Sequence, residues 1–294
     1  MDQTGSPAGQ FEAHRPHLRA MAFRFLGNQE DADDALQEAW LRLSATDAHQ
    51  IENLPGWLTT VVSRICLNAL RSRRRRPSEP LDDAAAFDRS SVPPAPTPEG
   101  EAVLGDSIGH ALLIVLDTLS PAERISFVLH DVFSISHEEI ATILGKSPQA
   151  CRQLASRARR RVRLAGDPAS DPRRQREIVD AFLAAARSGD LQTLVTLLSP
   201  DVELVADSQA VAMGGPARLA GPDAVAARFS GGAKAARTAM LGGVAGLVWA
   251  RGGTPAVAFD FTVEGGRVTR IEMIADNDVL DEIDIEFVRR GRSR

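Results

Sequence analysis

A proline-rich stretch in the first half of the chain sets the organisation of the sequence around it. Residues 77–100 hold six prolines among Ser, Asp and Ala and show no helical or strand periodicity. Such a composition resists packing into a core and marks the boundary of a folded module. A second, shorter break runs from Ala165 to Pro172. The 294 residues are thus predicted to form three modules, over 8–76, 101–164 and 174–290, with a flexible linker at 77–100.

The composition argues against membrane and secreted classes. No run approaches 18 consecutive apolar residues, and the polar N-terminus, residues 1–10, lacks the apolar region of a signal peptide. The two cysteines, Cys66 and Cys151, each stand alone within a helical pattern. We therefore expect buried thiols in a reducing cytoplasm, with no disulfide, no metal and no cofactor.

The charge is unevenly distributed along the chain. The formal net charge is −5, which is unusual for a protein that binds nucleic acid. However, basic residues gather in two blocks, Arg64–Arg76 and Arg152–Arg163, and acidic residues gather at Glu30–Glu38. Two basic faces and one acidic face predict both a nucleic acid and a protein partner.

The first module is predicted to be helical. Asn28 can cap a helix that follows Gly27, and a second helix opens at Asn53-Leu-Pro55. Apolar residues recur at helical spacing in both: Ala32, Ala35, Leu36, Ala39, Trp40 and Leu43 in the first, and Trp57, Leu58, Val61, Val62, Ile65, Ala69 and Leu70 in the second. The opposite face of the second helix carries Thr60, Arg64, Asn68 and Arg71.

The second module is predicted to hold four helical segments. Two capping boxes, Ser120-Pro-Ala-Glu123 and Ser136-His-Glu-Glu139, each open a helix. The chain turns at Gly145, and Pro148 then starts a final helix of about 15 residues, ~22 Å long. An apolar stripe precedes these segments: Val103, Leu104, Ile108, Leu112, Val115 and Leu119.

A short helix, a tight turn with glycine and a longer helix form the helix-turn-helix pattern, here at Gly145–Arg163. We expect an inner face of Cys151, Leu154, Ala155, Ala158 and Val162. Arg and Gln suit base edges in the major groove, so bases are assigned to Arg152, Gln153 and Ser156, with Gln149 beside them. Phosphates are assigned to Arg157, Arg159, Arg160, Arg161 and Arg163. A solvated basic face on an ordinary helix is the alternative.

The third module changes in character. Helices are expected over about Gln175–Ser188 and Leu191–Leu198, and strands over Val202–Ala206, Gly243–Arg251, Ala256–Val263 and Arg267–Ile274. Gly252-Gly253 and Gly265-Gly266 stand between strands as turn signals. This order predicts an α+β domain, a curved sheet with helices on one face.

Several of these segments together resemble a known family. Residues 31–43 and 53–65 look like region two of extracytoplasmic-function sigma factors of bacterial RNA polymerase, and residues 119–124 and 147–159 resemble their region four. The chain is similar to the subgroup that carries a C-terminal SnoaL-like domain. The implied fold is multi-domain: a region two helical bundle and a region four helix-turn-helix, both all-α, and an α+β cone like ketosteroid isomerase.

The resemblance implies a role for each module. Region two would bind the largest subunits of core RNA polymerase, through Asp31, Asp33, Asp34, Gln37, Glu38 and Leu41. Capture of the −10 element would rest on Asn53, Trp57, Thr60, Arg64, Asn68 and Arg71, because strand opening needs stacking and positive charge. Trp57 fits the apolar core equally well. Region four would read the −35 element of promoter DNA through Gly145–Arg163.

The C-terminal module is expected to be regulatory, through an intramolecular contact with the sigma domains or a small-molecule ligand. Members of the subgroup often carry Trp-Leu-Pro-Glu-Pro in the linker and Asp-Gly-Gly-Gly-Lys in the C-terminal domain. Here the stretches read Pro77-Ser-Glu-Pro-Leu81 and Val205-Ala-Asp207-Ser-Gln. The usual linker contact is therefore not implied by these residues.

Two other functions are open from the sequence. One is a helix-turn-helix repressor with a ligand-sensing domain, which would leave the acidic first module without a purpose. The other is a SnoaL-like small-molecule isomerase, which needs a base and acidic donors. The chain has no Tyr and no His after His137, so only carboxylates such as Asp201, Asp207, Asp260 and Glu272 could act. We therefore expect no catalytic residues and no enzyme activity.

Overall fold

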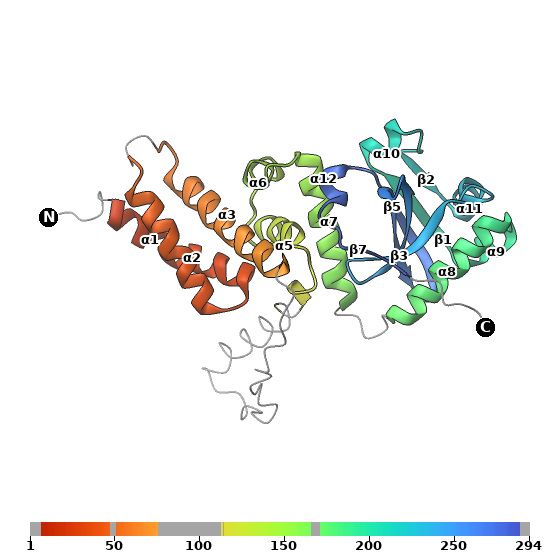
Figure 1. Cartoon of the computed structure of the whole chain (residues 1–294), viewed down its shortest axis with the longest axis horizontal. Coiled ribbons are helices and arrows are strands. Elements are labelled where there is room, and N and C mark those ends of the chain that lie inside the picture. The colour runs from red at the N-terminus through yellow and green to blue at the C-terminus, as the bar shows by residue number, and fades with distance from the viewer. Residues whose placement is uncertain (1–6, 48–50, 76–112, 114, 166–170, 289–294) are drawn as a thin grey trace, which may run out of the picture. The chain divides into compact units, whose positions relative to one another are not determined.

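The computed structural model describes residues 7–47, 51–75, 113, 115–165 and 171–288 (Figure 1). The chain divides into two compact units, Met1–Val162 and Arg163–Arg294, and each is described by itself. The predicted modules 8–76 and 101–164 fall almost wholly in the first unit, and 174–290 falls in the second. Among the described helices, none is long and apolar enough to cross a membrane.

The first unit begins with three helices that pack on one another, α1 (Pro7–Leu26), α2 (Gln29–Ser44) and α3 (Leu54–Arg75) (Figure 1). Gly27 joins α1 to α2 at a φ of 83°, which a glycine adopts at little cost. Asn28 then caps α2 by accepting a hydrogen bond from the backbone N–H of Asp31 at 2.8 Å, as predicted. Helix α1 has no counterpart among the predicted helices.

The predicted apolar stripes of α2 and α3 form most of this core. Trp40 is only partly buried, and the centroid of its ring lies 5.3 Å from that of Phe11. Three other predicted core residues are also partly exposed: Trp57, Val61 and Ala69. Cys66 is buried, which raises the pKa of its thiol to about 12. The predicted core residues that are buried are Ala32, Ala35, Leu36, Ala39, Leu43, Leu58, Val62, Ile65 and Leu70.

The rest of the first unit is built from α5 (Pro121–Phe127), a π-helical turn η3 (Val128–Val132), α6 (His137–Leu144) and α7 (Pro148–Ala165). Both predicted capping boxes form, with reciprocal bonds between Ser120 and Glu123 and between Ser136 and Glu139. Of the apolar stripe expected before α5, Leu119 is buried and Val115 is partly buried. Its other members, Val103, Leu104, Ile108 and Leu112, lie outside the described residues.

The second unit is α+β. It opens with α8 (Pro172–Ser188) and α9 (Leu191–Leu197), and short helices α10 (Ser208–Ala212), α11 (Pro222–Phe229) and α12 (Asn277–Leu280) follow. The strands are β1 (Leu198–Ala206), β2 (Arg218–Ala220), β3 (Ala236–Leu241), β4 (Ala245–Arg251), β5 (Thr254–Glu264), β6 (Arg267–Ile274) and β7 (Ile285–Phe287).

These strands form one mixed sheet in the order β2-β1-β6-β5-β4-β3-β7. Strand β1 pairs parallel with β6, and the other pairs are antiparallel. Strand β6 has the predicted bounds, and the tight turns before and after β5 hold the predicted glycine pairs, all with positive φ. Six elements have no predicted counterpart: β2, α10, α11, β3, α12 and β7.

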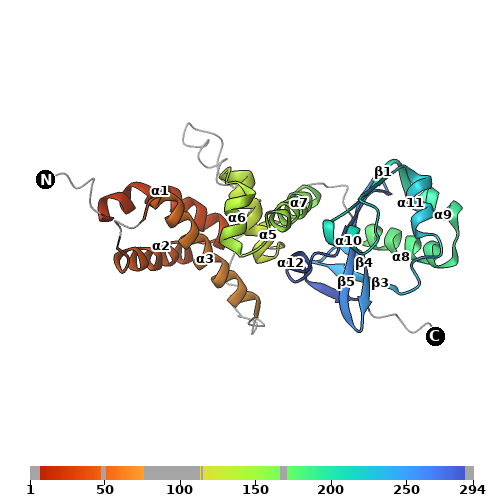
Figure 2. The same ribbon diagram turned by 90° about the horizontal axis from the view of Figure 1, so that it is seen from above.

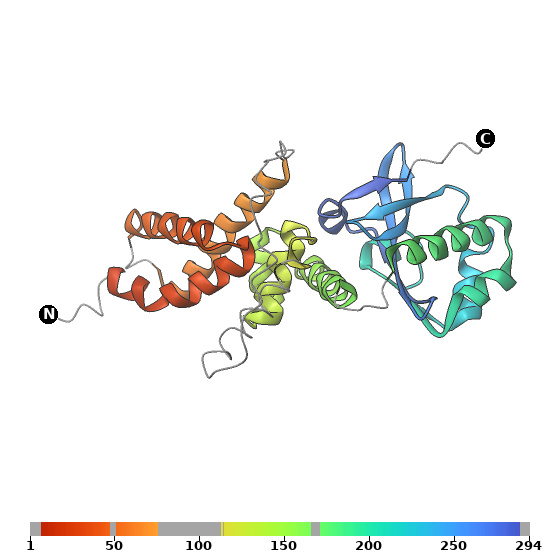
Figure 3. The same ribbon diagram turned by 90° about the horizontal axis from the view of Figure 1, so that it is seen from below.

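Helices α8, α9 and α11 cover one face of the sheet (Figures 2 and 3). Phe182 of α8 and Phe229 of α11 meet the strand residues Phe259 and Phe261 in a chain of edge-on ring contacts at 5.1–5.6 Å between centroids. Because side chains alternate along a strand, Asp260 of β5 faces away from this core. The predicted arrangement of a sheet with helices on one face is therefore found for the larger helices.

Candidate nucleic-acid and polymerase interface

Helices α6 and α7 form the predicted helix-turn-helix. The turn between them is closed by Gly145, whose φ is 66° and whose backbone N–H donates to the carbonyl oxygen of Ala141. Ser147 caps α7 by accepting from the N–H of Ala150 at 3.0 Å. The predicted inner face of α7 is buried at Cys151, Leu154, Ala155 and Ala158, whereas Val162 is partly exposed.

The start of α7 presents polar side chains to solvent. Gln149 and Arg152 are exposed, and Arg152 Nη1 donates to Gln149 Oε1 at 2.9 Å. Gln153 and Ser156, one turn along, are half-buried. The residues predicted to read bases therefore lie together at the N-terminal end of the helix, where a major-groove helix places its base contacts.

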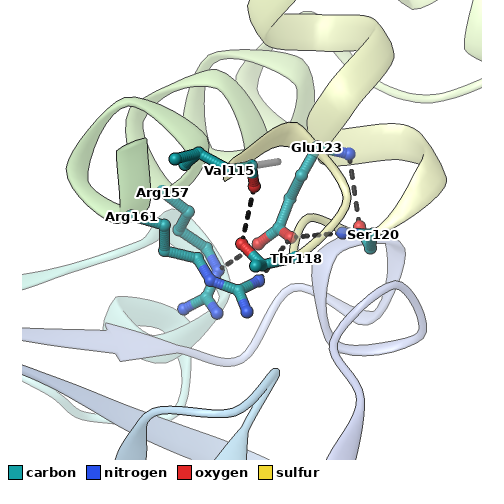
Figure 4. A network of polar contacts seen from close by, with 6 residues as sticks. All are labelled: Val115, Thr118, Ser120, Glu123, Arg157 and Arg161. Carbon is teal, nitrogen blue, oxygen red and sulfur yellow. Dashed lines mark hydrogen bonds and ion pairs between the residues drawn. The ribbon is translucent and has the colours of Figure 1, made fainter. Parts of the chain in front are cut away.

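Two arginines of α7 are not on this surface, which corrects the sequence analysis. Arg157 is 1% exposed and its Nε donates to Glu123 Oε1 at 3.1 Å. Arg161 is 8% exposed and its Nη1 donates to Glu123 Oε2 at 2.9 Å (Figure 4). Both guanidinium groups are directed to the interior against α5. The prediction that Arg157 and Arg161 contact phosphates is therefore wrong for this structure.

The remaining arginines of α7 stay at the surface. Arg159 makes a two-pronged ion pair with Asp131 of η3, at 2.8 and 3.0 Å, and this hydrogen bonding raises the pKa of Arg159. Its side chain is nevertheless 42% exposed. Arg160 is partly exposed and Arg163 is exposed. These three positions remain predicted phosphate contacts.

A histidine pair lies beside this surface. The rings of His130 and His137 stack with centroids 3.9 Å apart, and His130 Nδ1 lies 3.0 Å from the carbonyl oxygen of Ile135. Burial lowers the pKa of His137, and the positive charges of His130, Arg152 and Arg159 lower it further. The pair is not predicted from the sequence, because stacking across a turn has no signature in residue spacing.

Helix α2 presents the acidic surface. Asp34, Gln37, Glu38 and Leu41 are exposed at spacings that place them on one face, and the Leu41 side chain is 60% exposed. These four residues are exposed members of the predicted polymerase-binding face.

Three of the predicted partner-binding carboxylates of α2 are already paired within the fold, Glu38 with Arg42 of the same helix and Asp31 and Asp33 with other helices. Asp33 accepts two hydrogen bonds from Arg19, at 2.6 and 3.0 Å, and these lower its pKa. Partial burial raises the pKa of Asp31, but hydrogen bonds from Asn28 and Arg73 outweigh it and leave the pKa lowered. Asp31 and Asp33 therefore help to fix α2 against α1 and α3.

Helix α3 presents the second basic surface. Arg64 and Asn68 are exposed, whereas Thr60, Arg71 and Trp57 are partly exposed. Trp57 is thus partly buried in the core and partly exposed to solvent. Asn53 is exposed at the start of the helix, where its Oδ1 accepts from the N–H of Gly56 at 3.1 Å.

Arg64 also connects α3 to the helix-turn-helix. Its Nη2 donates to the carbonyl oxygen of Thr142 at 2.8 Å and its Nε to that of Ile143 at 3.2 Å, both near the end of α6. Arg124 of α5 makes a similar bond, from Nη1 to the carbonyl oxygen of Phe25 in α1 at 3.0 Å. Sequence spacing gave no sign of either contact.

The structure shows the surroundings of the four carboxylates named as candidates for an isomerase. Asp207 is 4% exposed and accepts from the backbone N–H groups of Ala210, Ala275 and Asp276 at 2.7–2.9 Å. Glu272 accepts from Arg270 Nε at 3.0 Å. Asp260 is buried on the sheet face away from the main core, and Asp201 is exposed. Asp207 thus ties the end of β6 to α10.

Comparison with known proteins assigns the two helical parts to one class. Residues 10–76 match the family model of Sigma-70 region 2, and residues 110–162 match that of Sigma-70, region 4. The chain is 34% identical over 290 residues to the probable ECF RNA polymerase sigma factor SigI of Mycobacterium tuberculosis, a match that covers 98% of this chain and 99% of that protein.

A second relative is the ECF RNA polymerase sigma factor SigJ of Mycobacterium tuberculosis, 40% identical over 221 residues, or 74% of this chain and 70% of that protein. The crystal structure of the extracytoplasmic function sigma factor SigJ is matched with a TM-score of 0.38 at 34% identity, over 94% of this chain and 98% of that one. The chain belongs to the ECF sigma factors of RNA polymerase, and its function is in transcription initiation.

Proposed function

We propose that the two helical parts carry three binding surfaces, one for core RNA polymerase and two for promoter DNA. The exposed strip of α2 binds the largest subunits of core RNA polymerase, the basic face of α3 takes the −10 element, and the start of α7 reads the −35 element. One observation supports this division most directly. Gln149 and Arg152 are exposed together at the start of a capped recognition helix, while the opposite face of that helix is buried.

The proposed −35 surface is narrower than the sequence alone predicts. It keeps Arg152, Gln149, Gln153 and Ser156 near bases and Arg159, Arg160 and Arg163 near phosphates. Arg157 and Arg161 are left out because Glu123 holds both in the interior. The proposed −10 surface keeps Arg64, Asn68, Arg71, Thr60, Asn53 and Trp57.

Run-off transcription with core polymerase tests the polymerase surface. In the strip of α2, Leu41→Ala removes the exposed leucine, and we expect promoter-dependent product and affinity for core polymerase to fall about fivefold or more. Leu191→Ala is the matched control, because Leu191 of α9 is also an exposed leucine, 45% exposed. Equal effects of the two substitutions would contradict the assignment of α2.

For the second unit we propose a SnoaL-like domain that modulates the activity of the sigma factor. Its support is the element order, two helices followed by a mixed sheet with the larger helices on one face. A chain that ends at Ala165 should differ from the full chain in run-off activity or in affinity for core polymerase. Identical values for both would remove the regulatory role and leave the promoter assignments untouched.

A further inference from the structure

The second unit contains a cavity of about 260 Å³ between the sheet and two short helices. Its walls come from α10 and the loop that follows, from α11 and the loop before β3, and from strands β3–β6. This volume equals that of about nine water molecules at ~30 Å³ each. It is slightly below the range of about 300–1,000 Å³ that holds drug-sized ligands, so its occupant is a small molecule.

The lining is aromatic and apolar. Phe229, Trp249 and Phe259 contribute rings from α11, β4 and β5, and Met213 and Met273 contribute thioethers at the mouth and in the wall. Small residues, Ala or Gly, make up most of the remaining lining. Flat rings with small residues between them favour a planar apolar ligand.

The lining residues include no group able to act as a general base. Asp, Glu and His are absent from them. Asp207 accepts a hydrogen bond from the backbone of the lining residue Ala210, but its carboxylate is occupied by three backbone N–H groups. Along β6 the alternation of side chains turns Met273 to the cavity and Glu272 away from it. The cavity is therefore equipped to bind a molecule without transforming it.

Arg228 is the one charged residue of the lining. It is exposed, which places it at the rim, and among the described residues no carboxylate pairs with it. An apolar pocket with a single unpaired cation at its mouth is complementary to a molecule that carries one negative charge on an apolar body.

We propose that this cavity binds a flat apolar acid of about two fused rings, with its carboxylate at the rim beside Arg228. Binding of such a molecule does not depend on the proposed regulatory role. A failure of either proposal is therefore visible by itself, one in a binding titration and the other in transcription.

Calorimetric titration of the full chain with 2-naphthoate and with naphthalene-2-carboxamide tests the proposal. The two molecules share their rings and differ by one charge at neutral pH. We expect the acid to bind about fivefold more tightly than the amide, the upper range for an exposed ion pair. Arg228→Ala should remove this preference and leave the affinity for the amide unchanged. Arg251→Ala, at an exposed arginine outside the lining, is the control that keeps it.

Filling the cavity provides an independent test. Ala233→Leu adds volume inside the lining and should abolish binding of both molecules, whereas Ala224→Leu, on the exposed side of α11, should leave it unchanged. If Ala233→Leu does not fold, Ala235→Leu at the exposed rim takes its place. The proposal is overturned if neither molecule binds the unmodified chain, if the amide binds as well as the acid, or if the filled cavity binds both as before.

Discussion

Helices α3 and α7 carry the two basic blocks of the chain and use their arginines differently. In α7, Arg157 and Arg161 enter the interior, where one carboxylate, Glu123, accepts from both. In α3 the arginines are at the surface, and Arg73 pairs with Asp31 in a contact that is about half exposed to solvent. A basic run therefore does not define a binding face by itself, because a single buried carboxylate on a neighbouring helix converts part of it into core.

The largest expected difference between the two helices is in stability, when the carboxylate paired with each is removed. Glu123 is the carboxylate paired with α7, and Asp31 is the one paired with α3. Glu123→Ala removes the buried carboxylate that accepts from both buried guanidinium groups and should lower the free energy of unfolding by about 3–5 kcal/mol. Asp31→Ala removes a partly exposed partner of α3 and should cost at most about 1 kcal/mol. Urea unfolding of the two variants measures both values, and similar losses would show that the buried and exposed pairs are equivalent.

The exposed arginines of α7 should divide by position along the helix. Arg152→Ala should lose about 1–3 kcal/mol of discrimination at one base pair of the −35 element. Arg160→Ala should weaken binding to all sequences alike and reduce the slope of the salt dependence by about one. Binding of the polymerase complex to promoter variants over a range of salt measures both. A uniform loss from both substitutions would contradict the division into base and phosphate contacts.

The corresponding test on α3 uses Arg64, whose partners are backbone carbonyl oxygens instead of a carboxylate. Arg64→Ala should cost about 1–3 kcal/mol in stability, the net value of two typical hydrogen bonds. It should reduce strand opening at the −10 element about fivefold, because the protein loses a positive charge that holds the single strand. Permanganate reactivity of unpaired thymines measures opening. If the strands open fully and binding to the −35 element is weaker, Arg64 belongs to the −35 surface and not to the −10 surface.

Part of the fold could be predicted because its signals are local. The capping boxes at Ser120 and Ser136, the left-handed turn at Gly145 and the bounds of β6 each depend on a few adjacent residues. Helix α11 carried such a signal too, since Pro222 at its first turn precedes buried Val225 and Phe229 at helical spacing. It was missed because the surrounding stretch is rich in Ala and Gly, which give little periodic contrast.

The site is harder to predict from sequence, because charge and periodicity indicate different faces of α7 for the same arginines. Ala150, Leu154, Arg157 and Arg161 recur at intervals of three and four, so the spacing alone places both arginines on the inner face of α7. Nothing in the spacing indicates that Glu123, 34 residues earlier than Arg157, would receive them. Long-range pairs of this kind, like the contact of Arg64 with α6, depend on tertiary packing and have no local signature.

The smallest expected difference between the two helices is a response to acid. His137 of α6 stacks on His130 of η3 beside Arg152 and Arg159 of α7, with Glu138 on its own helix and Asp131 of η3 paired to Arg159. Neither α3 nor α7 itself contains a histidine, so the effect belongs to the stacked pair beside α7. Because burial lowers the pKa of His137 in the folded chain, the unfolded chain binds a proton more readily as the pH falls through about 6.5. The stability of this part of the chain should therefore fall below that pH.

The pH effect can be isolated by one substitution. His137→Gln should flatten the fall in the urea midpoint between pH 7.5 and pH 5.5, because the side chain that resists protonation is gone. His14→Gln is the matched control, since His14 of α1 lies outside the stacked pair, and it should retain the fall. If both variants lose stability with acid as the unmodified chain does, the carboxylates of the fold and not the stacked histidines set its response to pH.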